Sequence, residues 1–336
     1  MTHPRRPGTV LVTGGAGYVG AVLVPRMLAL GYRVKVLDLF LYGGDVLDGV
    51  VDHPALELIE GDIRDRDRVR RALKGCDSVI HLACISNDPS FELDPELGRS
   101  INLHAFRPLV EMSRAVGVQR FINASSSSVY GIKDEPDVHE EMALEPLTEY
   151  SRYKADCESI LSELQSPEFT TVTLRPATVC GYSPRQRLDV VVNILTTHAV
   201  HDGKVRVFGG EQKRPNLHIE DMVAAYVHVL EQPDEKIAGE VFNVGCENHT
   251  VLELATIVRD VVGPDGIELE VVPTDDSRSY HISSRKIEQR LGFRTRRTVG
   301  DAVRDLVRAF DSGRLPDAMN DPRYHNIRRM QEAHLA

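Results

Sequence analysis

The chain of 336 residues contains no tryptophan, and only 6% of its residues are aromatic. Its five cysteines are scattered, odd in number and form no C-x-x-C pair. This pattern argues against a disulfide framework or a zinc site and predicts a reducing, cytoplasmic environment. No apolar stretch approaches the ~18–20 residues that a membrane span requires, and the basic N-terminus lacks the apolar core of a signal peptide. We therefore expect no membrane partner and no bound metal.

Positive charge is also scarce, because 40 Lys and Arg residues face 50 Asp and Glu residues, for a net charge of −10. A general nucleic-acid binder needs a basic surface, so we expect no nucleic-acid partner. The hydrophobic share of 42% and the charged share of 27% are typical of a globular protein and exclude a disordered or collagen-like chain. At ~150 residues per domain, the length predicts about two domains.

The first half of the chain alternates short apolar runs with helical patterns. Such alternation predicts an α/β fold with a doubly wound parallel sheet. Beyond Pro176, Pro and Gly become frequent and the strands shorten. We expect a dinucleotide-binding domain at 1–175 and mainly a substrate lobe at 176–336, with some segments returning to the first domain. The expected strands are Thr9–Val12, Arg33–Leu37, Leu56–Glu60, Ser78–Leu82, Arg120–Ala124 and Thr170–Leu174, and the expected helices are Tyr18–Leu30, Arg66–Lys74, Asp94–Val116 and Tyr150–Gln165.

The polar, turn-rich tail from Leu315 onward has two interpretations. It could be a surface extension, or a strap that packs on the substrate lobe or on a second subunit.

The strongest local signal is the glycine-rich segment at residues 13–20, between a buried strand and a helix. Gly14 permits a tight turn, Gly17 lets the backbone approach a pyrophosphate, and Gly20 allows the helix to pack closely on the strand. The helix N-terminus then offers unpaired N–H groups to the phosphates. The segment predicts a Rossmann-type dinucleotide site, with Tyr18 and Val19 also at the cofactor.

Acidic residues at the next two strand ends indicate which dinucleotide binds. Asp38 stands 18 residues after Gly20, where a carboxylate bonds the ribose hydroxyls and disfavours a 2′-phosphate. The expected cofactor is therefore NAD. Asp62, followed by Ile63, ends up at the same sheet edge and would bond the adenine amino group. Alternatively, Asp62 is a helix cap.

A tyrosine and a lysine carry the predicted chemistry. Tyr150 and Lys154 are four residues apart, so they share one face of a helix, whereas Tyr153 points about 100° away. A neighbouring ammonium and a cationic nicotinamide favour ionisation of a phenol whose ordinary pKa is ~10. We therefore expect Tyr150 to act as a general base. A serine from the upstream run at 125–128 would bond the same substrate oxygen.

On these motifs the chain resembles the extended short-chain dehydrogenases/reductases, of the nucleotide-sugar epimerase/dehydratase kind, over nearly its whole length. The resemblance implies that Ser126 is the active-site hydroxyl. It also implies that Asn102 distorts its helix and helps to anchor Lys154 through water, and that Leu82 and Ala83 contact the cofactor. The substrate would be a nucleotide-diphosphate sugar. The helices at 94–116 and 150–165 resemble those of a four-helix dimer contact, so a homodimer is expected.

The second lobe carries the expected substrate contacts. Arg214 and Arg278 resemble the family's diphosphate-binding arginines, although either could form a surface ion pair instead. Ser127 and Thr178 would also contact the substrate. Thr178 stands where many members have Asn, and Pro215 stands where they have Asp. Further candidates for the sugar pocket, each equally interpretable as an ordinary loop residue, are Asn87, Asp88, Arg185, Arg187, His249 and Tyr280.

The resemblance implies a first step in which NAD⁺ takes hydride from the sugar C4 while tyrosinate takes the hydroxyl proton. Family 4,6-dehydratases place Asp and Glu directly after the active hydroxyl residue, and decarboxylases usually keep the Glu. This chain has Ser127 and Ser128 there. We therefore expect an epimerase that acts through a transient 4-keto sugar. The alternatives are an NAD-dependent nucleotide-sugar dehydrogenase or 4-ketosugar reductase, and less favourably a 4,6-dehydratase or a non-catalytic dinucleotide sensor.

Overall fold

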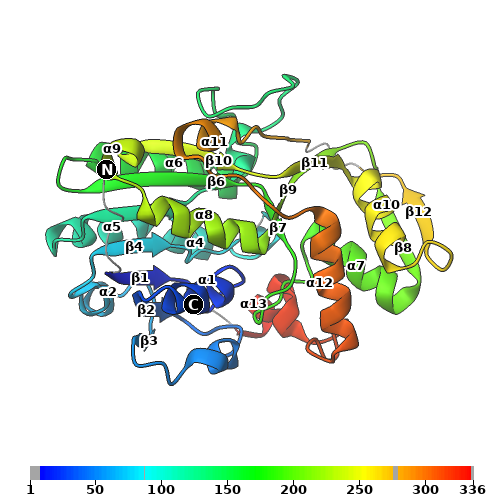
Figure 1. The fold of residues 1–336 in the computed structure, drawn as a ribbon, viewed down its shortest axis with the longest axis horizontal. Coiled ribbons are helices and arrows are strands. Elements are labelled where there is room, and N and C mark those ends of the chain that lie inside the picture. Colours follow the sequence, from blue (N-terminus) through cyan, green and yellow to red (C-terminus); the bar gives the residue numbers. More distant parts are fainter. Residues whose placement is uncertain (1–7, 87, 275–278, 334–336) are drawn as a thin grey trace.

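A seven-stranded parallel sheet forms the centre of the computed structural model, which describes residues 8–86, 88–274 and 279–333 (Figure 1). The strand order is β10-β6-β5-β4-β1-β2-β3, which confirms the predicted doubly wound α/β fold. The strands are β1 (Thr9–Thr13), β2 (Arg33–Asp38), β3 (Leu56–Glu60), β4 (Ser78–His81), β5 (Arg120–Ala124), β6 (Thr170–Pro176) and β10 (Glu240–Val244).

The six strands expected in the first half are all present, each within two residues of its predicted ends. Their continuous apolar runs reflect burial on both faces of a parallel sheet. In β1, Val10 and Val12 contact one hydrophobic core, and Leu11 between them contacts the other. One helix layer, α1 (Gly20–Ala29) and α8 (Ile219–Glu231), covers the first core. A second layer, α2 (Arg66–Leu73), α5 (Phe106–Ala115) and α6 (Glu149–Leu164), covers the other.

The mostly helical stretch predicted at 94–116 is present in three pieces, and the distortion implied at Asn102 is confirmed. A short α4 (Pro95–Arg99) leads into a π-helical turn, η2 (Ser100–His104), and then into α5. The π turn holds Asn102, whose side-chain amide accepts from the Ile85 N–H and donates to the Ile85 carbonyl, both at 2.9 Å. The distortion joins this helix to the loop after β4, which also contains α3 (Asp88–Leu93).

The second half builds a smaller lobe around its own apolar core. Its sheets have the orders β11-β9-β7 and β12-β8. One segment from this half, β10, pairs in parallel with β6 in the central sheet. The domain boundary at residue 175 remains a prediction. The lobe and its connections contain β7 (Thr178–Cys180), α7 (Val191–Asp202), β8 (Lys204–Phe208), β9 (Lys213–His218), α9 (Asp234–Ile237), β11 (Glu247–Thr250), α10 (Val251–Val262), β12 (Glu268–Val272), α11 (Arg285–Leu291) and α12 (Val299–Asp311).

The polar tail is packed against the rest of the molecule. Leu315, Ala318 and Tyr324 are buried against Leu188 in a small apolar cluster. The tail then forms η4 (Pro322–Tyr324) and α13 (Asn326–Ala333), which lies between the central sheet and α12 in Figure 1. The strap interpretation therefore describes this segment better than a surface extension.

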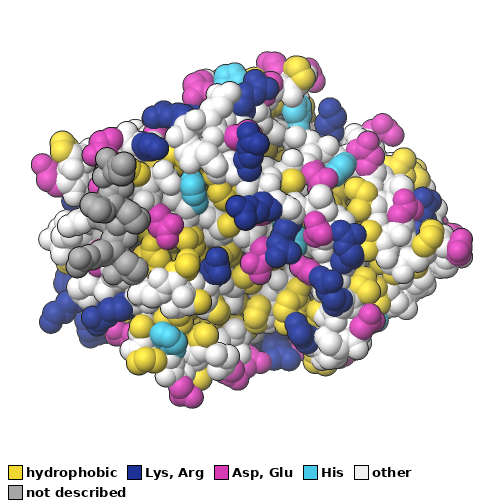
Figure 2. Space-filling view, in the orientation of Figure 1, with side chains coloured by type: hydrophobic (Ala, Val, Ile, Leu, Met, Phe, Trp, Pro, Cys, Tyr) yellow, Lys and Arg dark blue, Asp and Glu magenta, His cyan; other side chains and the backbone are white. Residues whose placement is uncertain are grey.

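Charges of both signs are interspersed on the face shown in Figure 2. On α12, for example, Arg304 lies 2.7 Å from Asp301, and Arg308 pairs with Asp305. Among the described residues, no helix has the length and apolar character that a membrane span requires.

The close packing of α1 on the glycine turn gives a first prediction. A Cβ on Gly20 would lie 2.4 Å from the Gly15 carbonyl oxygen, whereas a Cβ on Gly49 would meet nothing within 4 Å. We expect Gly20→Ala to lower the free energy of unfolding by ~1–3 kcal/mol, the usual cost of overpacking, and to weaken NAD binding. Urea denaturation and NAD titration test both effects, with Gly49→Ala as the control. Equal stability of the two variants would contradict the prediction.

Candidate active site

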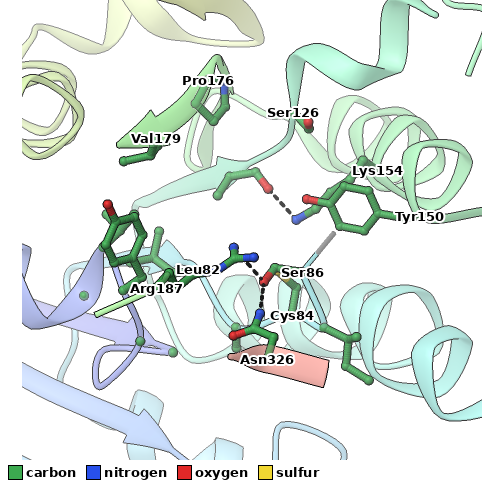
Figure 3. Close-up of a pocket in the computed structure, with 18 of the residues that line it drawn as sticks. Leu82, Cys84, Ser86, Ser126, Tyr150, Lys154, Pro176, Val179, Arg187 and Asn326 are labelled. Carbon is green, nitrogen blue, oxygen red and sulfur yellow. Dashed lines mark hydrogen bonds between the residues drawn. The ribbon is translucent and has the colours of Figure 1, made fainter. Parts of the chain in front are cut away.

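A pocket lies along the carboxyl ends of the central strands and is closed on the other side by the second lobe (Figure 3). Open parallel sheets bind nucleotides at this edge. The pocket brings together most of the side chains and backbone positions expected at the site, although their roles remain predictions. Those that line it are Gly14, Gly17, Tyr18, Val19, Asp38, Asp62, Ile63, Leu82, Ala83, Ser126, Ser127, Tyr150, Lys154 and Thr178.

The glycine turn has the geometry that a dinucleotide diphosphate needs. Gly14 has a φ of +73°, which favours glycine, and its N–H donates to the Leu37 carbonyl at 2.9 Å. Within the described chain, no side chain caps the start of α1 at Val19, and its first turn contains no acidic residue. Among the described residues, no side chain therefore competes with a phosphate for the N–H groups of the turn that leads into α1.

Tyr18 connects the glycine turn to the second lobe. Its buried hydroxyl donates to the Gly181 carbonyl at 2.6 Å and accepts from the Asn193 amide at 3.0 Å. The Ser183 hydroxyl in turn donates to the Tyr18 carbonyl at 2.7 Å. These contacts hold the two sides of the pocket together at the end that contains the glycine turn.

The two acidic residues at the expected adenosine end are both anchored. Asp38 accepts from the Ala16 N–H at 2.9 Å and from the Phe40 N–H at 2.8 Å. Burial raises the pKa of Asp38, and these N–H donors oppose that shift. Asp62 accepts from the Arg64 N–H and pairs with the Arg64 guanidinium, both at 2.7 Å. It does not cap α2, because Asp65 does so.

The expected base and its lysine project from α6 into the other end of the pocket. The Lys154 ammonium donates to the Ala124 carbonyl at 2.7 Å and lies 5.8 Å from the centre of the Tyr150 ring. Burial raises the pKa of Tyr150, and the Lys154 charge opposes that shift. A capping box formed by Thr148 and Ser151 fixes the start of α6 directly beside Tyr150.

A row of hydroxyls faces this pair from the end of β5. The Ser126 hydroxyl accepts from the Ser128 N–H at 3.1 Å and shares a hydrogen bond with the Ser128 hydroxyl at 2.9 Å. Ser126, Ser127 and Ser128 all line the pocket. The positions that follow the expected active hydroxyl therefore present neutral groups to the substrate.

Two other candidate bases lie outside the pocket. The Tyr153 hydroxyl accepts from the Arg99 guanidinium at 2.9 Å on another side of α6. The His81 ring is hydrogen-bonded to the Thr13 hydroxyl at 2.7 Å, and burial lowers its pKa to about 3. A neutral, fully enclosed imidazole of this kind is structural.

Several expected site residues are placed elsewhere. Asn102 does not line the pocket, because its amide is bonded to Ile85. The Arg214 guanidinium is also absent from the lining, but it lies 5.3 Å from the ring centre of Tyr280, which is part of the lining. His249 does not line the pocket, and its ring nitrogens lie 3.4 and 3.6 Å from the carboxylates of Glu247 and Glu253. Arg278 and Asn87 lie outside the described residues.

Sequence reasoning missed part of the lining. Tyr42 and Cys84 follow two of the predicted strands and could have been included by position. Ser86 also follows β4, and its hydroxyl accepts from the Arg187 guanidinium at 3.2 Å. Asn326 and Met330 come from the C-terminal helix. No local pattern could have placed them here, because only tertiary packing brings the tail to the pocket.

Comparison with known proteins identifies the class. The sequence profile of the NAD dependent epimerase/dehydratase family matches residues 10–245, so the chain belongs to this family. An uncharacterized protein, y4nG of Sinorhizobium fredii, is 34% identical over 254 residues, which cover 74% of this chain and 59% of that protein. A dTDP-glucose 4,6-dehydratase from Streptomyces griseus is 29% identical over 84% of this chain and 88% of its own.

Solved structures agree on the fold and the cofactor. The dTDP-glucose 4,6-dehydratase DesIV from Streptomyces venezuelae, crystallised with NAD and TYD, superposes with a TM-score of 0.82 at 25% identity. The superposition covers 94% of this chain and 99% of that one. The family is NAD-dependent, and the glycine turn, the open start of α1 and Asp38 fit NAD here. Relatives at 27–29% identity include an epimerase, a decarboxylase and dehydratases, so relatedness by itself leaves the reaction open.

The anchored carboxylate at the end of β2 predicts the cofactor preference. We expect NAD to bind at least ~100-fold more tightly than NADP, since a 2′-phosphate beside Asp38 would juxtapose like charges. Asp38→Asn should lower the ratio of NAD affinity to NADP affinity. Asp45→Asn, outside the pocket, should leave this ratio unchanged. Fluorescence titration with both reduced cofactors measures the ratio, and equal affinities in the unmodified protein would refute the prediction.

Proposed function

We propose that this protein is an epimerase that inverts C4 of a nucleotide-diphosphate sugar through a transient 4-keto sugar. One observation carries the proposal. The pocket joins Ser126, Tyr150 and Lys154 into a set that can deprotonate a sugar hydroxyl, but Ser127 and Ser128 follow directly. Bound NAD would supply the reversible acceptor for the C4 hydride.

Each residue of the set has a defined task. Tyr150 takes the proton from the C4 hydroxyl as C4 is oxidised and returns a proton when C4 is reduced. The Lys154 ammonium, held by Ala124, stabilises the phenolate. The Ser126 hydroxyl bonds the same sugar oxygen and keeps it within reach of the phenol.

Elimination of water across C5 and C6 would require an acid and a base near those carbons. Serine hydroxyls have no suitable pKa for that work, so positions 127 and 128 favour a reaction confined to C4. Asp88 is a carboxylate in the pocket lining, but it accepts a hydrogen bond from the Thr148 hydroxyl at 2.6 Å, on the α6 side. It is better placed to hold the start of α6 than to replace the missing pair.

Inversion also requires that the keto sugar rotate in the pocket, so that its opposite face meets the cofactor, while its diphosphate stays bound. Arg214, beside Tyr280 at the pocket edge, would hold the diphosphate together with Arg278. Ser127 and Thr178 would contact the sugar or its diphosphate from opposite walls. A UDP-glucose 4-epimerase from Cyamopsis tetragonoloba, 27% identical over 88% of this chain and 93% of its own, shows that the family includes this reaction. We include a homodimer and a cytoplasmic location in the same proposal.

The alternative is a nucleotide-sugar dehydrogenase or 4-ketosugar reductase. Such an enzyme would use the same residues but would exchange its cofactor after each hydride transfer. A non-catalytic sensor would not need Tyr150 and Lys154, which this chain retains in the pocket. The two experiments below separate these functions.

Replacement of the expected base tests the catalytic set. We expect Tyr150→Phe to lower turnover by ~10²–10⁴-fold, the usual contribution of a general acid–base group. NAD binding and the melting temperature should change little, because the ring remains. The matched control is Tyr153→Phe, one residue along the same helix but outside the pocket, which should retain near-normal turnover. If the two variants are equally active, Tyr150 is not the base.

Isotope tracing separates the epimerase from the other reactions. Purified protein is incubated with nucleotide sugars deuterated at C4, including UDP-glucose and UDP-glucuronic acid, with which the relative MoeE5 has been solved at 28% identity. We expect the C4 epimer to keep its deuterium and to gain none from heavy water, as followed by NMR. Stoichiometric NADH in solution with an oxidised sugar would support the dehydrogenase, and solvent deuterium at C5 would support a dehydratase.

A further inference from the structure

The C-terminal segment, residues 315–333, crosses from the second lobe to the dinucleotide-binding domain over the pocket. In its middle, the Tyr324 carbonyl accepts from the Leu188 N–H at 2.9 Å in the second lobe. Nearer its end, the Arg329 guanidinium donates to the Leu41 carbonyl at 2.6 Å, just beyond β2. Asn326 and Met330, on the same helix α13 as Arg329, line the pocket. The segment therefore spans both walls of the cofactor cleft.

Asn326 is the point at which these walls meet (Figure 3). Its side-chain amide donates to the Ser86 hydroxyl at 3.0 Å, in the loop after β4. Its side-chain oxygen, Oδ1, accepts from the Arg185 guanidinium at 2.5 Å, and its backbone N–H donates to the Asp189 carboxylate at 3.0 Å. Both partners lie in the loop before α7. Because Asn326 is only 2% exposed, these bonds are shielded from competing water.

The loop that Asn326 holds carries two buried arginines. Arg185 stacks on the Tyr42 ring at 3.5 Å, and Arg187 pairs with Asp189 at 2.9 Å. Both line the pocket, yet Arg185 Nε and Arg187 Nη2 find no hydrogen-bond partner among the described residues. Buried guanidinium N–H groups without partners are costly, so a bound anion would satisfy them.

Position identifies that anion as part of the cofactor. Tyr42 follows β2 and Asp38, at the expected adenosine end. Near the glycine turn, the Asn193 amide donates to both the Tyr18 hydroxyl, at 3.0 Å, and the Arg187 carbonyl, at 2.7 Å. Met330 packs in the same apolar cluster as Leu41 and Ile63. The segment therefore covers the part of the pocket that would hold the adenosine and the diphosphate of NAD.

We propose that residues 315–333 form a clasp that retains NAD between turnovers, with Asn326 fastening it and Arg185 and Arg187 contacting the dinucleotide. A retained cofactor suits a reaction that returns its hydride to the same sugar. The clasp depends on NAD binding and not on the epimerase reaction, so its test uses cofactor release.

Protein loaded with NADH is mixed with excess NAD, and the fall in NADH fluorescence gives the release rate. We expect Asn326→Ala to release NADH at least ~10-fold faster, because two side-chain hydrogen bonds of the clasp are lost. Met330→Ala, which removes the apolar contact, should act in the same direction. The matched control is Arg328→Ala, on the same helix. Its guanidinium donates to the Met319 carbonyl of the segment itself, and Arg328 does not line the pocket.

Calorimetric titration with UDP and the melting temperature without NAD complete the test. Faster NADH release with unchanged UDP affinity and unchanged melting supports the clasp. Unchanged release in Asn326→Ala and Met330→Ala overturns it, and so does a weakened UDP affinity with normal NADH release, which would assign the arginines to the substrate. If Asn326→Ala fails to fold, Met330→Ala decides between these outcomes.

Discussion

A buried ion pair beneath the pocket sets the positions of all three expected catalytic residues. The Arg175 guanidinium on β6 donates to both oxygens of the Glu158 carboxylate on α6, at distances of 2.7 to 3.2 Å. Glu158 also accepts from the Ser125 hydroxyl, next to Ser126, and Arg175 donates to the Tyr130 hydroxyl at 2.7 Å. Because an unpaired charge here would be strongly destabilising, β5, α6 and β6 can be arranged in few other ways. The ion pair thereby helps to fix the position of Tyr150 on α6 relative to Ser126 at the end of β5.

The two ends of the pocket near this ion pair differ in the groups that they present: backbone groups at one end and side chains at the other. At the end expected to hold the dinucleotide, the groups that face the pocket are mainly backbone atoms of the Gly14 turn and the uncapped start of α1. Backbone groups of this kind are compatible with many different side chains. The reactive end of the pocket relies on a few side chains held by α6 and β5. The expected reaction depends on these side chains, so related chains can share this fold and differ in the reaction that they catalyse.

The C-terminal segment adds a constraint that neither half of the chain contains alone. By bonding Ser86 and Arg185 at once, Asn326 couples the two walls of the cleft. Contacts at Asn326 and at Tyr18 both join the two walls of the cleft. Under the clasp proposal, NAD stays bound in such a cleft while the sugar exchanges. This arrangement links the architecture of the tail to the choice between an epimerase and a dehydrogenase.

Local patterns determined much of this protein. Apolar runs predicted the six strands because both faces of a parallel sheet are buried, and the glycine turn, Asp38 and the Tyr150–Lys154 spacing depend on short-range geometry alone. The distortion of the 94–116 helix at Asn102 was implied by the family resemblance, but only the tertiary structure showed that Asn102 bonds the loop after β4 and that Asn326 closes the pocket. Both effects come from contacts between segments far apart in the sequence, and polar residues have partners there that no periodicity reveals.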